Sequence, residues 1–242
     1  MKDTTESFEF QWKHLLEAPG LLSDPAWRAN VAEYILEELE STRQELTGKR
    51  VLDAGLGNGR WAYGFQQLGC QVFGFDTSPS GVAYARKHVA GKFDVVDILD
   101  LTRLRELYAE RSMDVVWNWG VIHHTTDPRR AFSNLARFVK IGGKLHIYVY
   151  GRKSLTNKLL HATFNLFSLE NRLTLAKFLS KFNGASPHSN FDAFSPSHSE
   201  HTEQEVETWF VENGLTYKRV HPTWHGVNRS RDIFATGIQT DG

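Results

Sequence analysis

The sequence predicts an α/β fold in which a parallel sheet carries helices on both faces. Short apolar runs alternate with helical segments from Val51 to Tyr150, and this alternation requires parallel strands joined by helical crossovers. The first run, Val51 to Ala54, breaks into three alternating glycines at positions 55, 57 and 59, and the second run ends in Asp76. Strand, glycine turn, helix, strand and carboxylate in this order form half of a nucleoside-binding unit.

The segment before the first strand, residues 8–46, is expected to be helical and to pack on the sheet. Asp24 and Pro25 supply an N-cap and a proline for the first helical turn. Apolar side chains then recur at four-residue spacing, at Trp27, Val31, Ile35 and Leu39. Trp12 lies upstream of this stripe, where it either closes a ligand site or only packs.

The remaining elements follow from the same pattern. Strands are expected at 51–54, 71–75, 93–96, 113–118 and 143–150, with helices at 59–68, 79–89, 102–110 and 128–139. After Gly151 the alternation stops, and the apolar positions of 154–182 predict two inserted helices. Residues 182–198 are rich in Gly, Pro and Ser and are expected to be a surface loop. Thr202 is expected to cap a helix at 203–213, and two strands, 215–221 and 231–238, end the chain.

The glycine spacing separates two classes of ligand. A dinucleotide site needs G-x-G-x-x-G, whereas this chain reads G-x-G-x-G and has Arg60 where the third glycine belongs. With Asp53 in front, the run resembles the D-x-G-x-G-x-G motif of class I S-adenosylmethionine-dependent methyltransferases, in particular the small-molecule enzymes of methyltransferase types 11 and 12. The resemblance covers roughly residues 48 to 150 and continues through three later blocks, at 74–78, 96–99 and 114–124.

The resemblance implies a single methyltransferase domain over residues 1–242, with a Rossmann-like doubly wound sheet of seven strands and an antiparallel hairpin edge. Residues 1–46 would form an N-terminal helical lid, residues 47–151 the cofactor-binding half and residues 152–200 a helical substrate cap. Residues 201–242 would supply the last helix and the strand pair.

Composition excludes several other classes of protein. The chain has 242 residues, of which 40% are apolar, so it can bury one sizeable core. Its 28 basic and 28 acidic residues balance, and nothing marks a nucleic-acid binder. The polar N-terminus and the single Cys70 fit a reducing, cytoplasmic location. No run reaches the roughly 20 apolar residues of a membrane span. We expect a monomer or homodimer acting on a small-molecule acceptor.

By resemblance, S-adenosylmethionine would be held by residues at the carboxyl ends of the strands. Asp53 would hold the methionine ammonium directly or through water, and Arg60 would either meet the carboxylate or remain a solvated residue of the first helical turn. Asp76 would bind the ribose hydroxyls beside Thr77, and Asp97 the adenine amine, with the Ile98 N–H on a ring nitrogen. The backbone of Gly55, Gly57, Asn58 and Gly59 would lie under the cofactor, and Asn118, Trp119 and Gly120 beside its methionine portion.

Methyl transfer is an in-line displacement in which orientation supplies much of the rate, so a base is not obligatory. If one acts, His123 and His124 are the first candidates, because they follow the fourth strand and histidine titrates near neutrality. His124 is preferred, since similar enzymes place a pocket-facing histidine before a Thr-x-x-Pro loop. His201 is the third candidate. Each histidine has a structural alternative in which it only satisfies loop backbone.

A metal site is not expected, although the chain has eleven histidines. The spacing matches no closed zinc pattern and no second cysteine exists. The candidate ligands for such a site are His188, His198, His201, His221 and His225.

The sequence therefore predicts a methyltransferase that acts on an oxygen, nitrogen or carbon nucleophile of a small molecule. Two alternatives remain open: an S-adenosylmethionine-binding protein that does not methylate, and an oxidoreductase that uses a NAD-type dinucleotide. The acceptor itself is not encoded in any motif that we can identify.

Overall fold

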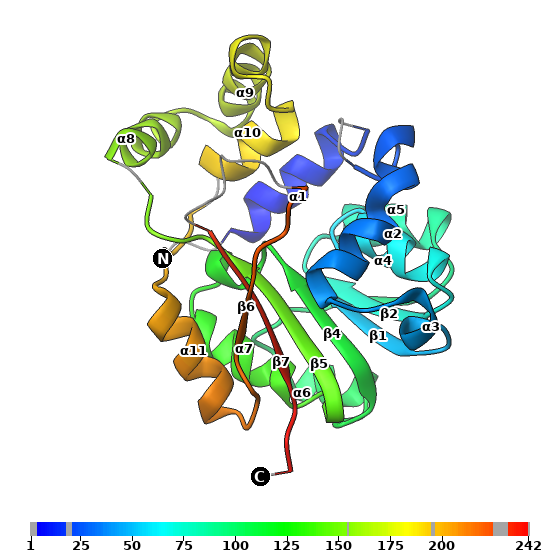
Figure 1. The fold of residues 1–242 in the computed structure, drawn as a ribbon. Coiled ribbons are helices and arrows are strands. Elements are labelled where there is room, and N and C mark those ends of the chain that lie inside the picture. Colours follow the sequence, from blue (N-terminus) through cyan, green and yellow to red (C-terminus); the bar gives the residue numbers. More distant parts are fainter. Residues whose placement is uncertain (1–3, 18–20, 154, 195–196, 225–231, 242) are drawn as a thin grey trace.

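A seven-stranded mixed sheet forms the centre of the molecule (Figure 1). The computed structural model describes residues 4–17, 21–153, 155–194, 197–224 and 232–241. Its strands are β1 (Arg50–Ala54), β2 (Gln71–Asp76), β3 (Lys92–Val95), β4 (Met113–Trp119), β5 (Val139–Val149), β6 (Lys218–Val220) and β7 (Ile233–Ile238). They lie in the order β3-β2-β1-β4-β5-β7-β6. The first five are parallel and β7 is antiparallel to both of its neighbours, which confirms the predicted fold class.

Helices cover both faces of this sheet, as the alternation predicted. On one face lie α2 (Pro25–Leu39), α4 (Arg60–Gln67) and α5 (Pro79–His88), whose buried side chains share one core with β1 and β2; the short α3 (Arg43–Leu46) joins them. On the other face lie α6 (Leu101–Leu107), α7 (Pro128–Ala136) and α11 (Glu203–Glu212). The 3-10 turn η1 (Ile122–His124) links β4 to α7.

A third core lies beyond the carboxyl ends of the strands. It joins α1 (Thr5–His14) to the inserted helices α8 (Leu155–Phe164), α9 (Leu169–Asn183) and α10 (Pro187–Phe194). Trp12 of α1, Phe164 of α8 and Phe191 of α10 are all buried there. The N-terminal helix and the inserted helices thus pack together beyond the carboxyl ends of the strands, as Figure 1 shows.

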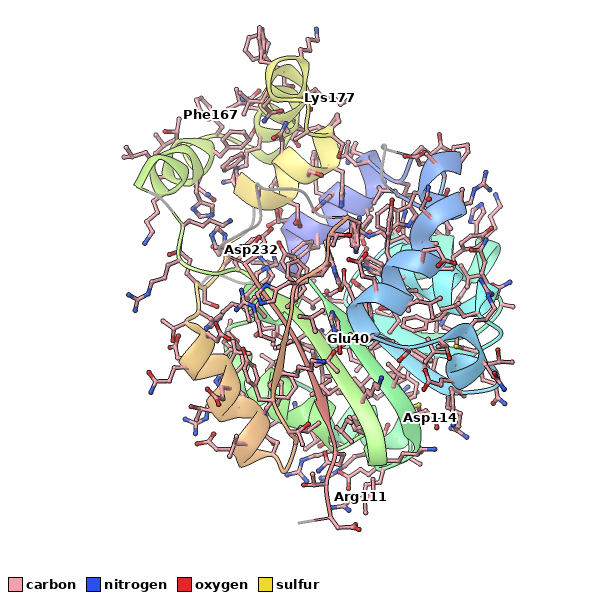
Figure 2. All side chains as sticks on the ribbon, viewed as in Figure 1. Glu40, Arg111, Asp114, Phe167, Lys177 and Asp232 are labelled. Carbon is pink, nitrogen blue, oxygen red and sulfur yellow. The ribbon has the colours of Figure 1, made fainter. Side chains whose placement is uncertain are left out.

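The amino ends of the strands are tied together by Asp114, at the side of the sheet remote from α1 and α8–α10 (Figure 2). Its carboxylate accepts a hydrogen bond of 2.9 Å from the Arg50 backbone N–H and pairs with Lys49 and Lys140. Although burial opposes it, pairing with Lys140 lowers the pKa of Asp114 below its ordinary value. This network joins β1 to β4 at the end where no ligand is expected.

Two parts of the element assignment were wrong. The stretch predicted as helical holds three separate helices, α1, α2 and α3, because the N-caps Asp24 and Thr42 have extended backbone angles and each starts a new helix. Residues 187–194, predicted as surface loop, form α10. The signal for α10 was Ser186-Pro187, since the Ser186 hydroxyl accepts the Ser189 N–H at 3.1 Å as an N-cap does. Phe191 is fully buried, so this segment is part of a core despite its polar composition.

Helix α11 begins with a capping box, which refines the predicted N-cap. The Thr202 hydroxyl accepts the Glu205 N–H at 3.2 Å, and the Glu205 carboxylate accepts the Thr202 N–H at 2.7 Å. Together these bonds satisfy two of the backbone donors that a helix start leaves unpaired.

We expect Thr202→Ala to lower the free energy of unfolding by about 1 kcal/mol, because it leaves the Glu205 N–H without its cap. Urea denaturation followed by circular dichroism measures this change. Thr208→Ala, the same substitution on the exposed side of α11, is the matched control and should change stability by about 0.5 kcal/mol or less. Equal losses in the two variants would contradict a stabilising cap.

Candidate active site

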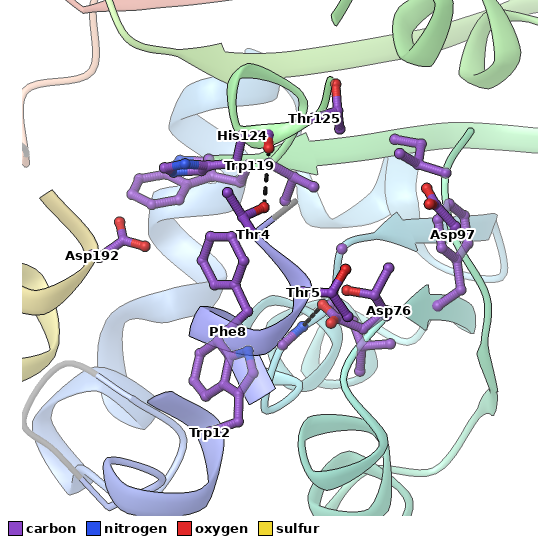
Figure 3. Close-up of a pocket in the computed structure, with 18 of the residues that line it drawn as sticks. Thr4, Thr5, Phe8, Trp12, Asp76, Asp97, Trp119, His124, Thr125 and Asp192 are labelled. Carbon is purple, nitrogen blue, oxygen red and sulfur yellow. Dashed lines mark hydrogen bonds between the residues drawn. The ribbon is translucent and has the colours of Figure 1, made fainter. Parts of the chain in front are cut away.

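A cavity of about 280 Å³ lies at the carboxyl ends of β1, β2, β3 and β4, under α1 and α10 (Figure 3). In the strand order, β1 lies between β2 and β4, so the chain proceeds from β1 through β2 and β3 on one side and then crosses back to β4 on the other. At such a reversal of strand order, open α/β sheets form the crevice in which they bind ligands. Of the site residues predicted from the sequence, the following line the cavity: Gly55, Gly57, Asn58, Arg60, Asp76, Thr77, Asp97, Ile98, Trp119, Gly120 and His124.

The turn after β1 is built from glycines in the left-handed region. Gly55, Gly57 and Gly59 have φ values of 83°, 54° and 86°. A Cβ on Gly55 would lie 2.3 Å from the Val121 side chain, and one on Gly57 would lie 2.4 Å from the Trp12 ring. Shape and conformation therefore both require glycine at 55 and 57. Gly59 does not line the cavity but starts α4 as its N-cap.

Asp76, at the end of β2, is held in place by backbone amides. Its carboxylate accepts hydrogen bonds of 2.8 Å from the Gly57 N–H and 2.8 Å from the Ser78 N–H. Burial raises the pKa of Asp76 above its ordinary value, while these N–H groups and that of Thr77 oppose the rise. A fixed carboxylate beside the glycine turn is suited to accept hydrogen bonds from a pair of hydroxyl groups.

Two carboxylates follow β3 and lie in different surroundings. Asp100 is the N-cap of α6 and accepts the Arg103 N–H at 3.0 Å. Asp97 lines the cavity, and one of its oxygens accepts the Leu99 N–H at 2.8 Å. The Asp97 carboxylate can therefore also meet a ligand donor in the cavity, and the neighbouring Ile98 lies on the same wall.

The side chains of Asp53 and Asn118 do not line the cavity, whereas Asp53 was expected to hold the ammonium directly or through water and Asn118 to lie beside the methionine portion. Asp53 is buried beneath the glycine turn, where it accepts the Ala62 N–H, and burial together with the Asp76 charge raises its pKa to about 7. The Asn118 amide donates to the Ala54 carbonyl at 2.8 Å. Both side chains thus hold the turn from below and are placed to support it without lining the cavity.

Arg60 is enclosed by indole rings. Its guanidinium carbon lies 5.1 Å from the ring centre of Trp27, 5.5 Å from that of Trp61 and 4.9 Å from that of Trp119. A cation over aromatic faces is stabilised electrostatically, and Arg60 is partly buried, which favours a ligand role over that of a solvated residue. It lines the cavity and can meet an anionic group there.

Helix α1 supplies one wall of the cavity through Thr4, Thr5, Phe8 and Trp12, of which the sequence singled out only Trp12. The helix is fastened to the start of α5: the Glu9 carboxylate accepts hydrogen bonds from the hydroxyls of Ser78 and Ser80 and from the Ser80 N–H. Although burial opposes it, this set of donors holds the pKa of Glu9 at about 2. Glu9 is therefore ionised at neutral pH, and its hydrogen bonds to Ser78 and Ser80 hold α1 in place over the cavity.

Among the histidines named as bases, His124 lines the cavity. Its Nδ1 lies 2.9 Å from the Ser197 carbonyl oxygen, which fixes Nδ1 as the donor and leaves a lone pair on Nε2. Nε2 is buried and has no hydrogen-bond partner among the described residues. Burial lowers the pKa of His124, and the nearby Asp192 charge opposes this, so the ring is neutral at pH 7.

His123 and His201 lie outside the cavity. His123 is fully buried behind it, between the rings of His124 and Tyr150, and burial lowers its pKa well below the ordinary value. His201 bridges to Gly151 in parallel register, and its Nε2 lies 2.7 Å from the Ser199 hydroxyl. His201 instead lines a separate surface recess beside Arg152 and Thr202.

Helix α10 contributes two residues that the sequence reasoning missed, His188 and Asp192. His188 lies 2.7 Å from the Gln11 amide through Nδ1, and Asp192 accepts the Tyr150 hydroxyl at 3.0 Å. Figure 3 shows Asp192 directed toward Phe8 from the helix opposite α1. With α10 predicted as a loop, no sequence signal placed these side chains near His124.

Within the described ranges, no group of three or more His, Cys, Asp or Glu side chains is arranged to hold a metal ion. His225, one of the histidines weighed for such a role, lies outside them. Nor does any described helix combine the length and apolar character that a membrane crossing requires.

Residues 52–147 match the family model described as "Methyltransferase domain". The chain is 33% identical over 146 residues to a ubiquinone biosynthesis O-methyltransferase of Sinorhizobium medicae, covering 60% of this chain and 56% of that protein. It is 36% identical over 117 residues to the protein of the same name from Xanthomonas euvesicatoria, covering 48% of each. The chain thus spans about half the length of the relatives it matches.

The fold is shared with solved methyltransferase structures. Magnesium protoporphyrin IX methyltransferase of Synechocystis, with bound SAM, has a TM-score of 0.59 at 14% identity and covers 99% of this chain and 98% of its own. The 1,6-didemethyltoxoflavin-N1-methyltransferase of Burkholderia thailandensis has a TM-score of 0.56 at 16% identity, covering 100% and 92%. Residues 52–147 thus match a methyltransferase domain, and the fold is that of the solved methyltransferase structures, as the resemblance implied.

We expect Gly57→Ala to displace Trp12 and loosen α1, because the new Cβ would lie 2.4 Å from the indole ring. Limited proteolysis of the N-terminal segment should accelerate in this variant. Gly142→Ala is the matched control: Gly142 also has a positive φ, of 75°, but nothing lies within 4 Å of its Cβ position. Both variants carry backbone strain of about 1 kcal/mol, so equal proteolysis rates would show that Trp12 does not rest on the turn.

Proposed function

We propose that the protein binds S-adenosylmethionine in this cavity and transfers its methyl group to a small-molecule acceptor. The observation that carries the proposal is the meeting of three features in one cavity: the left-handed glycine turn, the Asp76 carboxylate and the unpartnered Nε2 of His124. The match to the methyltransferase domain over residues 52–147 supports it.

The residues present fit the polar groups of this cofactor. Asp76 would hold the ribose hydroxyls, Asp97 and the Ile98 backbone the adenine, and Arg60 the carboxylate. Asn58 would take the ammonium, because its Oδ1 is buried at the cavity wall without a hydrogen-bond partner among the described residues. An acceptor without a donor is unfavourable in the interior, and a cationic ligand donor would satisfy it.

When bound, the cofactor supplies a methyl group already activated by a cationic sulfur, so the protein's task is to orient the acceptor and exclude water. The rings of Phe8 and Trp119 form apolar walls for the acceptor, and α1 closes the cavity from above. Orientation of this kind contributes several kcal/mol to a displacement reaction.

We infer that the acceptor atom is an oxygen and that His124 removes its proton. The ring is neutral, its tautomer is fixed by Ser197, and Nε2 is the nitrogen left to accept the hydroxyl proton. A base in the right state at working pH contributes on the order of 100-fold or more to the rate. The names of the relatives, which are O-methyltransferases, support the choice of oxygen.

A small acceptor is favoured by the enclosure of the site. The cavity of about 280 Å³ lies between α1 and α10, and the net charge of the chain is zero at pH 7. A cavity covered on two sides suits a molecule of moderate size better than a polymer that must lie in an open groove.

Calorimetric titration should detect binding of S-adenosylmethionine and S-adenosylhomocysteine and no binding of NADH. Asp76→Ala should weaken both interactions by about 2 kcal/mol, since a pair of charge-assisted hydrogen bonds is lost. Asp100→Ala, which removes a helix cap outside the cavity, is the control and should leave both affinities unchanged. Binding of NADH alone would contradict the proposal.

His124→Gln should lower kcat by about 100-fold or more with little change in affinity for S-adenosylhomocysteine, because the base is lost and the cofactor site is kept. The acceptor for this assay would come from a screen of hydroxyl compounds that detects S-adenosylhomocysteine release. Since burial lowers the pKa of His124 below 6.5, wild-type kcat/KM should stay constant through pH 7 and fall only below pH 6.5. A pH profile identical in wild type and variant would exclude His124 as the base.

A further inference from the structure

A buried acid–base pair lies behind the cavity wall. Glu38 of α2 and His146 of β5 are both fully buried, and the His146 Nε2 lies 2.7 Å from the Glu38 carboxylate. The His146 Nδ1 lies 2.8 Å from the Thr236 hydroxyl of β7, and the Trp117 ring stacks on the imidazole at 4.3 Å. The imidazole is thus held on two edges and one face.

The second oxygen of the Glu38 carboxylate connects this pair to the cavity. The Trp119 indole N–H donates to it at 3.3 Å. Trp119 lines the cavity and packs on the Tyr148 ring at 4.3 Å, and its own ring lies 4.9 Å from the Arg60 guanidinium carbon. A continuous set of contacts therefore runs from His146 through Glu38 and Trp119 to Arg60.

Stability alone does not account for this arrangement. Removing an acid and a base from water is unfavourable, and packed apolar side chains of the same size are commonly as stable or more stable. A carboxylate between the imidazole and the indole, however, fixes the rotation of Trp119 about its Cβ–Cγ bond, because a hydrogen bond is more directional than aromatic packing. The position of Arg60 depends on that indole, because the guanidinium lies over its face.

We propose that Glu38 and His146 are positioning residues: they fix Trp119, and through it they hold the Arg60 guanidinium toward the amino-acid end of the bound nucleoside. This inference rests on the proposed function. Glu38 and His146 contact neither ligand nor solvent, so they act only through Trp119 and Arg60. Their effect should be confined to the carboxylate end of the ligand.

Two related nucleosides separate this role from a general packing role. S-adenosylhomocysteine carries the amino-acid carboxylate, whereas 5′-methylthioadenosine lacks the amino-acid end and keeps the adenosine. Glu38→Leu should weaken S-adenosylhomocysteine by about tenfold in calorimetric titration, with a change of about twofold or less for 5′-methylthioadenosine. Glu38→Gln is the matched variant: its amide oxygen can still accept the Trp119 N–H, so most of the affinity should return.

A double-mutant cycle tests the route through Arg60. Arg60→Met should show the same selective loss as Glu38→Leu, and the double variant should be no weaker than Arg60→Met alone, because both changes remove one interaction. If Glu38→Leu does not fold, Trp119→Phe, which removes the indole N–H together with the five-membered ring and keeps an aromatic side chain, carries the same expectation.

Equal weakening of both nucleosides by Glu38→Leu or Trp119→Phe would overturn the inference, as would additive losses in the double variant. Either result with intact wild-type binding would leave the proposed function in place. A wild-type protein that binds neither nucleoside would overturn the proposed function, and the inference with it.

Discussion

The left-handed turn between β1 and α4 is the constraint on which the rest of the site depends. Its glycines let the backbone pass where side chains would collide with Val121 and Trp12. The same turn directs the Gly57 N–H to the Asp76 carboxylate, which joins the ends of β1 and β2. A Cβ at either glycine would move a wall of the cavity, so the shape of the site follows from a few backbone angles.

The second constraint is the attachment of α1. Glu9 binds the start of α5, while Trp12 rests on Gly57, so polar and apolar contacts together hold the helix across the cavity. Helix α1 also shares a core with α8, α9 and α10. The covering of the site is thus assembled from chain segments that precede and follow the sheet, and it brings Asp192 near His124 although they are 68 positions apart in the sequence.

The parts that local sequence patterns encode were predictable. The alternation of apolar and helical segments predicted the strands, and the glycine spacing predicted the turn and the place of Asp76. Each of these features depends on neighbours within a few residues. The contacts of Arg60 could not be predicted, since Trp27 and Trp119 reach it from different elements. His201 appeared beside the site in the sequence, but its bridge to Gly151 turns it away. Asp53 fits the motif, yet burial and the Ala62 N–H keep it beneath the turn.

Helix α10 was predicted as a surface loop because of the polar composition of its segment. Half of its residues are polar, but Phe191 and the partly buried Phe194 anchor it in the third core, and its polar residues bond to α1 and α9. Polar side chains that are satisfied by one another can be buried, which periodicity in a short segment does not reveal.

The most direct test of the account is a crystal structure of the protein with S-adenosylhomocysteine. We expect the ribose hydroxyls on Asp76, the adenine beside Asp97 and Ile98, and the ligand carboxylate at Arg60, with Trp12 still resting on the glycine turn. A ligand bound outside this cavity, or bound with its amino-acid end directed away from Arg60, would contradict it.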